Sequence, residues 1–253
     1  MPMSAYERSD GILVVSREEF CAARFVYKPG QHVTFGGPSQ WGKTSLCFDL
    51  LEYVATPELP AYVAVSKPKD KVTEQRGREL DYRFVEEWPA PPSLKYAFNG
   101  KPSGYIVKPR FGDINKDAET TGKVLGNLLA DRYIAGIHDK NGILVLDDTL
   151  VKAKVQGLDK QMVTLSAMAG AMGLGAWMFV QKPTGAGQAV LMSYSNSEHI
   201  FLTHDKDERN RRRYNEIGGF DSKLIFHVVA TLGRFQFLYV NAEGQMCIVD
   251  KKQ

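Results

Sequence analysis

Residues Gly36 to Ser45 read GGPSQWGKTS, and the part from Gly37 to Thr44 matches the phosphate-binding loop (P-loop) pattern G-x-x-x-x-G-K-S/T. In this pattern small residues let backbone N–H groups turn onto phosphate oxygens, the lysine neutralises the β and γ phosphates, and the hydroxyl completes the shell of a Mg²⁺ ion. Lys43 supplies the lysine, which makes it a catalytic candidate as well, and Thr44 supplies the hydroxyl. The expected nucleotide-binding residues are Gly37, Pro38, Ser39, Gln40, Trp41, Gly42, Lys43, Thr44 and Ser45.

The residues on either side of this loop have the secondary structure that the pattern requires. Residues 31–35 read as a short strand, and apolar residues recur with helical spacing from Leu46 to Val54. A glycine-rich turn that carries a lysine by chance is the alternative, and it is expected in about one chain in a hundred. The strand–loop–helix order favours a nucleotide phosphate site.

The second decisive stretch runs from Gly142 to Asp148 and reads GILVLDD. Apolar residues that end in two acids are typical of a buried parallel strand whose carboxyl end delivers carboxylates to a phosphate site, the Walker B pattern. Asp147 suits the Mg²⁺ shell, and Asp148 could orient or deprotonate an attacking water. A strand that ends in an acidic turn is common by itself. Its position after a P-loop favours the functional interpretation.

A third polar residue is expected at the same edge of the sheet. The predicted strand at 176–180 ends in Gln181, whose amide could sense the γ-phosphate or the water. A lone glutamine after a strand is normally a loop residue. Its register with Asp147 and Asp148 favours a catalytic role.

Two further segments are rich in charge. The run from Asp205 to Arg213 reads DKDERNRRR, and such mixed charge is usually solvated. The sharper alternative is that one arginine acts on the nucleotide of a neighbouring subunit. The segment from Lys67 to Arg83 is expected to be either an exposed helix face or a contact with backbone phosphates. The loop from Lys182 to Gly187 is a second candidate for contact with DNA. The candidate catalytic arginines are Arg209, Arg211, Arg212 and Arg213.

The composition is that of an ordinary soluble protein, with 43% hydrophobic and 24% charged residues and a formal net charge of +3. This charge is too small to imply nucleic-acid binding by itself, so any basic surface must be local. The 3 cysteines lack metal-ligand or C-x-x-C spacing, and the 5 histidines lack zinc-site spacing. We therefore expect reduced thiols and a cytoplasmic protein.

The stretch from Met162 to Val180 carries no charge, so a transmembrane helix is one interpretation. Its glycines indicate instead a break between a helix that ends near Ala171 and the strand at 176–180. We expect a buried helix–strand pair and no membrane insertion.

Residues 1–253 are expected to form a single α/β domain. It would comprise a core at about 31–203, an N-terminal extension at 1–30, and a C-terminal appendage at 204–253 that contains a β-hairpin. The other elements predicted from periodicity are strands at 12–15, 61–65, 104–108 and 199–203, a short element at 25–27, helices at 118–137 and 189–194, a proline-rich loop at 88–103, and hairpin strands at 235–240 and 246–249.

With these stretches placed, the chain resembles the FtsK/HerA superfamily of DNA-translocating ATPases. It looks most like the compact branch that includes the genome-packaging ATPases of poxvirus type and of membrane-containing phages. The resemblance covers about residues 31–203 and is strongest in GGPSQWGKTS, in ILVLDDTL, and in WMFVQ followed by a small helix and HIFLT. Many members have Asp-Glu where this chain has Asp147-Asp148, and a basic pair where it has residues 170–173.

The resemblance implies a RecA-like ASCE P-loop NTPase core, with a mostly parallel central sheet flanked by helices. It implies ATP and Mg²⁺ as ligands, with binding, water activation and γ-phosphate sensing by Lys43, Thr44, Asp147, Asp148 and Gln181. It also implies a homo-oligomeric ring, a pentamer or hexamer, around double-stranded DNA held without regard to base sequence.

We therefore expect an ATP-hydrolysing ring motor that translocates double-stranded DNA, as in viral genome packaging at a capsid portal or vertex. Such a protein would work in the host cytoplasm or associate with virions. The alternative is an ATP-dependent regulatory switch or assembly factor that does not translocate DNA. A small-molecule kinase is disfavoured, because Asp147, Asp148 and Gln181 suit water better than an acceptor hydroxyl.

Overall fold

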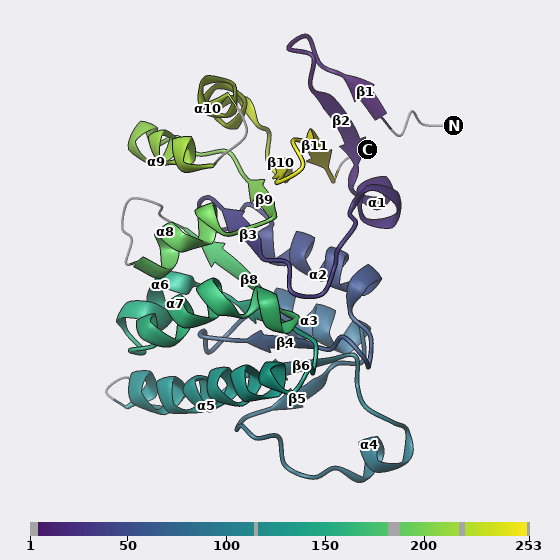
Figure 1. Cartoon of the computed structure of the whole chain (residues 1–253), viewed down its shortest axis with the longest axis vertical. Helices are drawn as coiled ribbons and strands as arrows, with labels where there is room; N and C mark the ends of the chain where they lie inside the picture. The colour runs from purple at the N-terminus through teal and green to yellow at the C-terminus, as the bar shows by residue number, and fades with distance from the viewer. Residues whose placement is uncertain (1–4, 114–115, 182–187, 218–220, 252–253) are drawn as a thin grey trace.

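A computed structural model describes residues 5–113, 116–181, 188–217 and 221–251. In these residues one 11-stranded sheet runs through the molecule in the order β1-β2-β11-β10-β9-β3-β8-β7-β4-β6-β5 (Figure 1). The strands are β1 (Ala5–Glu7), β2 (Leu13–Ser16), β3 (Val33–Gly36), β4 (Ala61–Ala64), β5 (Arg83–Val85), β6 (Gly104–Val107), β7 (Gly142–Leu146), β8 (Leu174–Val180), β9 (His199–Leu202), β10 (Gln236–Asn241) and β11 (Met246–Asp250). The α-helices are α1 (Arg17–Glu19), α2 (Lys43–Val54), α3 (Lys71–Glu79), α4 (Leu94–Phe98), α5 (Asp117–Ile137), α6 (Thr149–Lys154), α7 (Asp159–Met168), α8 (Gln188–Ser195), α9 (Glu208–Arg212) and α10 (Ser222–Thr231).

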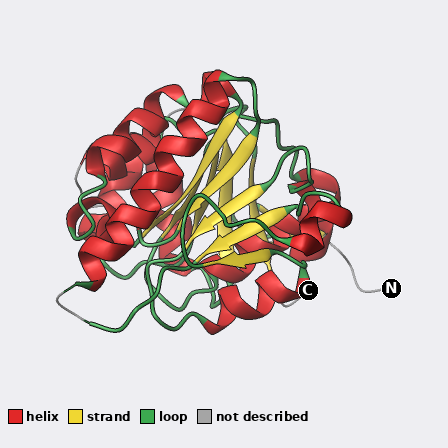
Figure 2. Cartoon of the chain, turned by 90° about the horizontal axis from the view of Figure 1, so that it is seen from below, coloured by secondary structure: helices red, strands yellow, loops and turns green. Residues whose placement is uncertain are grey.

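Along the part of the sheet that runs β9-β3-β8-β7-β4-β6-β5, every pair of adjacent strands is parallel. Both β7 and β8 are buried along their whole length, as uninterrupted apolar runs require when helices cover both faces of a sheet. Figure 2 shows the strands between helices on either side. The predicted α/β fold with a mostly parallel central sheet flanked by helices is confirmed.

The register of the central strands aligns their carboxyl ends. Strand β8 lies between β3 and β7, with Val180 opposite Gly36 and Met178 opposite Leu146. Residues that follow these strands therefore leave the sheet at one edge. This is the geometry expected for Gln181, which follows Val180 directly.

Each face of the sheet has its own hydrophobic core. On one face Phe35 packs in a cluster with Leu50 of α2, and this cluster extends to η1 (Phe20–Arg24). On the other face Leu144 packs with Leu128 of α5, and residues of α10 cover β9, β10 and β2. Because successive strand residues point to opposite faces, both sets come from the same short strands.

The segments expected as an N-terminal extension and a C-terminal appendage both add strands to the central sheet. The predicted hairpin is present as the antiparallel pair β10 and β11, and β10 pairs antiparallel with β9. Strand β2 then pairs parallel with β11, with Val15 opposite Val249. The two ends of the described chain thus lie side by side in the sheet (Figure 1).

Several elements differ from the prediction. Residues 25–27 form neither helix nor strand, because Phe25 and Tyr27 contribute rings that pack against Trp177 and His199. The loop at 88–103 contains the short helix α4. Helix α10 was not predicted, although its apolar face belongs to the core that covers β9 and β10.

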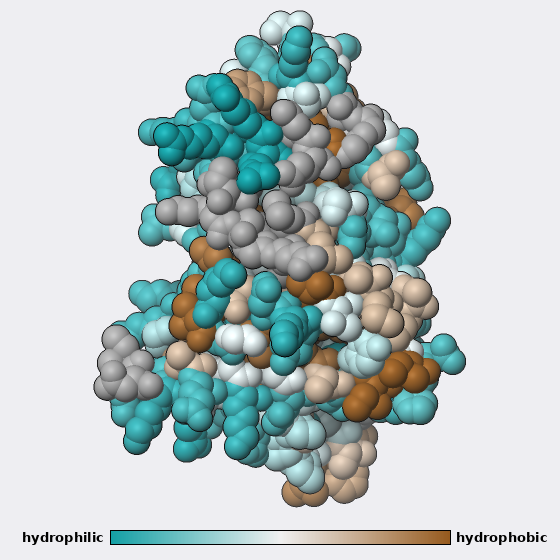
Figure 3. Space-filling view, turned by 60° about the vertical axis from the view of Figure 1, so that its left-hand side comes forward, coloured by the Kyte–Doolittle hydropathy of each residue, from teal (hydrophilic) through white to brown (hydrophobic). Residues whose placement is uncertain are grey.

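The uncharged stretch from Met162 to Val180 is divided between α7 and β8, with a left-handed turn at Gly173 (φ 69°) between them. The predicted helix–strand pair is confirmed. In the part of the chain that the structure describes, no helix is long and apolar enough to span a membrane. On the face shown in Figure 3, hydrophobic residues form small separate groups among hydrophilic ones.

The buried His199 predicts how the stability of the fold depends on pH. Its ring lies 2.8 Å from the Tyr239 hydroxyl and 3.0 Å from Gln31 Oε1. Burial lowers the pKa of His199 from 6.5 to about 4. Between these pH values the unfolded chain takes up a proton that the folded chain does not, so stability falls by on the order of 3 kcal/mol as the pH drops from 6.5 to 4.

Urea unfolding of the wild type and of His199→Gln at pH 7, 5.5 and 4.5 measures this contribution. We expect the variant to lose less stability on acidification than the wild type. The exposed His138 supplies the control His138→Gln, which should follow the wild type. An acid dependence of His199→Gln equal to that of the wild type would contradict the prediction.

Candidate nucleotide-binding site

The P-loop connects β3 to α2, and its backbone requires glycine at two positions. Gly37 and Gly42 have φ values of 122° and 90°, in the left-handed region. A Cβ on Gly37 would lie 2.0 Å from Thr203 Oγ1, so the loop is packed directly against the end of β9. Helix α2 begins at Lys43, and its N-terminal N–H groups and helix dipole favour an anion at this point.

Lys43 is buried and hydrogen-bonded to the loop itself. Its Nζ donates to the carbonyl oxygens of Gly37 and Pro38, each at 2.5 Å. The pKa of Lys43 is lowered to about 8, mainly by burial and also by the charge of Lys67, and the charge of Asp148 opposes this shift. A phosphate anion in the loop would supply the counter-charge that this cation needs.

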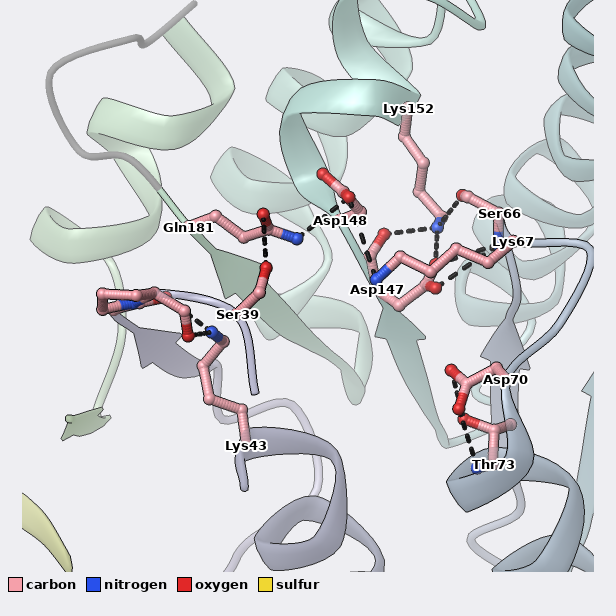
Figure 4. Close-up of polar contacts among 12 residues, drawn as sticks. Ser39, Lys43, Ser66, Lys67, Asp70, Thr73, Asp147, Asp148, Lys152 and Gln181 are labelled. Atoms are coloured by element: carbon pink, nitrogen blue, oxygen red, sulfur yellow. Dashed lines mark hydrogen bonds and ion pairs between the residues drawn. The ribbon is translucent and has the colours of Figure 1, made fainter. Parts of the chain in front are cut away.

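Asp148, Gln181 and Ser39 form a hydrogen-bonded chain across the carboxyl edge of the sheet (Figure 4). Gln181 Nε2 donates to Asp148 Oδ2 at 2.9 Å, and Ser39 Oγ donates to Gln181 Oε1 at 3.0 Å. The chain joins the P-loop to the ends of β8 and β7. The structure therefore brings together the second acid, the glutamine and the P-loop, which the sequence had placed at one edge.

The backbone of Asp148 is left-handed (φ 43°), which is uncommon for a residue other than glycine and turns the chain from β7 into α6. Lys67, after β4, places its Nζ 3.9 Å from Asp148 Oδ2 and is half exposed. The sequence predicts Lys67 within a charged segment that is either a solvated helix face or a contact with backbone phosphates. Lys67 lies instead at the mouth of the site.

Asp147 is paired with a buried lysine that the sequence analysis missed. Lys152 of α6 has a fully buried side chain, and its Nζ donates to Asp147 Oδ1, to the Asp147 carbonyl, and to Ser66 Oγ. The Ser66 N–H donates to the Asp147 carboxylate. The available signal was spacing, since Lys152 lies one helical turn beyond Asp148 and its long side chain can reach back to the neighbouring Asp147.

The donor set fits one Mg²⁺ ion held mainly by phosphate oxygens. Thr44 and Asp147 line the same cavity, and Asp147 Oδ2 is the carboxylate oxygen that does not contact Lys152, lying 3.4 Å from the N–H of Ser66. Mg²⁺ at such sites takes one or two protein ligands in addition to phosphates and water. Among the described residues there is no group of three or more His, Cys, Asp or Glu side chains that could hold a metal ion.

These groups line a cavity of about 580 Å³, a volume in the range of small-molecule sites. Cations surround it from several elements, with Arg76 on α3 and Arg234 and Lys251 near the hairpin. The last two were not predicted as site residues. The residues of the predicted P-loop set that line the cavity are Ser39, Gln40, Gly42, Lys43, Thr44 and Ser45.

The remaining predicted residues do not line this cavity. Pro38 and Trp41 line a neighbouring cavity, where the Trp41 ring lies 5.1 Å from that of His204. The four predicted arginines, on α9 and just after it, are not among the described residues that line the 580 Å³ cavity. Arg211 donates to the Asp205 carbonyl and Arg212 pairs with Glu208, whereas Arg209 is exposed. Within one subunit these arginines do not face the nucleotide site.

No protein-family model and no curated protein matches the sequence. Solved structures do match over most of the chain. The genome packaging NTPase B204 from Sulfolobus turreted icosahedral virus 2, in complex with ATP-gammaS, is 13% identical with a TM-score of 0.57, and the match covers 90% of this chain and 100% of that chain. B204, the DNA-packaging ATPase from Sulfolobus turreted icosahedral virus, is 15% identical with a TM-score of 0.59 and the same coverage.

VirB4 of Thermoanaerobacter pseudethanolicus is 10% identical with a TM-score of 0.63, and the match covers 98% of this chain and 95% of that chain. Likeness at such low identity shows the fold. This chain shares the fold of these structures, a mostly parallel sheet flanked by helices with a P-loop after one of its strands, as the sequence predicted.

Proposed function

We propose that this protein is an ATP-hydrolysing motor that moves double-stranded DNA, as a homo-oligomeric ring in viral genome packaging. The observation that supports the proposal is the Ser39–Gln181–Asp148 hydrogen-bonded chain, which lines the same cavity as Lys43, because a carboxylate and an amide are the groups that accept a proton from an attacking water and orient it. The similarity in fold to packaging NTPases supports DNA as the polymer that the proposed motor moves.

In the proposed reaction the P-loop N–H groups and Lys43 bind the triphosphate and neutralise its charge. Thr44 and Asp147 would hold Mg²⁺, which supplies further charge neutralisation when bound. Asp148 accepts a proton from the water as its oxygen attacks the γ-phosphorus, and the bond from the γ-phosphorus to the bridging oxygen breaks, so that ADP leaves. Gln181 holds Asp148 and orients the water.

Fewer residues are proposed as DNA contacts than the sequence suggested. In the segment from Lys67 to Arg83, Arg76 pairs with Asp49, Glu52 and Glu79, and Lys67 faces the nucleotide cavity. The exposed Lys69 and Lys71 remain as candidate phosphate contacts. The other predicted contact, the loop at 182–187, lies outside the described residues.

The first test separates ATP binding from hydrolysis. Lys43→Ala should abolish ATP binding, because it removes the cation that the loop holds beside the phosphates. Asp148→Asn should bind ATP normally and lose turnover by about 10²- to 10⁴-fold, the range for a general base. Binding titrations and phosphate release measure the two effects, and the exposed Glu87 gives the control Glu87→Gln. Hydrolysis by Asp148→Asn at the parental rate would refute its role.

A second test addresses the arginines of α9. If Arg209, which is exposed, acts on a neighbouring subunit, Arg209→Ala should bind ATP normally and lose turnover by roughly 10³-fold. Mixed with Lys43→Ala protein it should regain some activity, since each variant supplies the group that the other lacks. The exposed Lys154 on α6 provides the control Lys154→Ala. Full activity of alanine variants at all four arginines would show that these arginines are solvated and do not act in catalysis.

The third test concerns movement on DNA. Displacement of a third strand from linear duplex should require ATP hydrolysis and fail with a non-hydrolysable analogue. Lys69→Ala and Lys71→Ala should each weaken duplex binding about equally for unrelated sequences and lower the salt dependence by about one phosphate contact. Lys140→Ala, before β7 and at the opposite edge of the sheet, is the control. An enzyme that hydrolyses ATP but neither binds nor moves along duplex at low salt would favour the regulatory switch.

A further inference from the structure

The loop between α10 and β10 presents an aromatic ring to the nucleotide cavity. Phe235 has a left-handed backbone (φ 68°) and is half buried, a conformation that is rare for a bulky residue and therefore needs support from its surroundings. Its ring packs on the P-loop so closely that a Cβ on Gly42 would lie 2.8 Å from Phe235 Cδ1. The ring thus forms a wall of the cavity directly beside the P-loop.

The buried Arg17 fixes this wall in place. Its guanidinium donates to the Phe235 carbonyl at 3.1 Å and to Asp49 Oδ2 at 3.1 Å, and it lies 3.4 Å from Ser45 Oγ. It also lies over the Phe237 ring. One side chain from α1 therefore joins the first turns of α2 to the loop that carries Phe235.

Two cations flank the ring. Arg234 and Lys251 lie 4.9 Å and 5.8 Å from the centroid of the Phe235 ring, and both line the cavity. Their side chains and the Phe235 ring offer flat and cationic surface to a ligand. Such surface attracts the face of an aromatic ligand by stacking and cation–π contact.

The direction of a bound nucleotide follows from the positions of these groups. Asp148 and Gln181 mark the γ-phosphate end, and the P-loop N–H groups hold the α and β phosphates. Ser45, which follows Thr44, marks the opposite end of the phosphate chain, where Arg17 links it to Phe235. The base and ribose leave the phosphate chain at that end.

Resting on the function proposed above, we propose that Phe235, with Arg234 and Lys251, forms the nucleobase subsite and binds the flat face of the base. Recognition of the face rather than the edge does not distinguish adenine from guanine strongly, because both purines present a similar π surface. It favours purines over the smaller pyrimidines. The subsite therefore accepts purine nucleoside triphosphates as a class.

The test compares ATP with inorganic tripolyphosphate, which has the phosphates and no base. Phe235→Ala should weaken ATP binding about tenfold and leave tripolyphosphate binding within about twofold, since stacking on one aromatic ring accounts for a loss of this size. Phe235→Tyr keeps the ring and should bind ATP as the wild type does. Phe235→Leu keeps apolar packing on Gly42 without a π face, and should behave like Phe235→Ala. Phe98→Ala, at an exposed ring on α4, is the control.

Four outcomes would overturn the proposal. Equal loss for both ligands in Phe235→Ala and Phe235→Leu would show that the ring only shapes the P-loop. Val72 lines the same cavity from α3, and a selective loss of ATP binding in Val72→Ala, with none at Phe235, would place the base against that helix. Wild-type protein that binds tripolyphosphate as tightly as ATP would exclude a base subsite and leave the phosphate site intact. Wild-type protein that binds neither ligand would refute the proposed function as well, which distinguishes the two failures.

Discussion

Parallel pairing of β3, β8 and β7 is the constraint on which the site depends. Side chains alternate between the two faces along a strand. A shift of one residue in the register of β7 would therefore turn each of Asp147 and Asp148 to the face opposite the one it has now. The register is held by strands that are buried on both sides, with Leu146 opposite Met178. The packing of the apolar core thus fixes the positions of the polar groups at the carboxyl edge, although these groups are not part of that core.

The two adjacent acids have different surroundings for an electrostatic reason. A buried ammonium group needs partners for its donors, and Lys152 finds them in Asp147 and Ser66. One oxygen of Asp147 is thereby committed to a neighbour within the protein. Asp148 contacts an amide and a half-exposed lysine instead. The cation beside Asp148 is therefore partly solvated, whereas the cation beside Asp147 is fully buried.

The sequence predicted those parts of the structure that depend on short stretches of consecutive residues. The P-loop pattern, the apolar run before Asp147, and the strand before Gln181 each lie within about ten residues, and parallel strands bring their ends together by a general rule. Lys152 was missed because a lysine on a helix is normally solvated, and its burial depends on Asp147 and Ser66 together. Arg17 and Phe235 are 218 residues apart, so no local pattern relates them. The same distance explains why β2 and β11 were expected in separate segments.

The pairing of β2 with β11 has a consequence for synthesis of the protein on the ribosome. A nascent chain that has just emerged past β8 already contains the P-loop, both acids and Gln181, yet β2 pairs only with β1 until β11 has been made. Arg17, which directly follows β2, likewise lacks its contact with the Phe235 carbonyl until the loop before β10 has been made. Contacts of such long sequence separation form slowly and late in folding. A partly translated chain would therefore carry the phosphate loop before it carries the wall beside it, and β1 and β2 would join the central sheet only after β11 has been made.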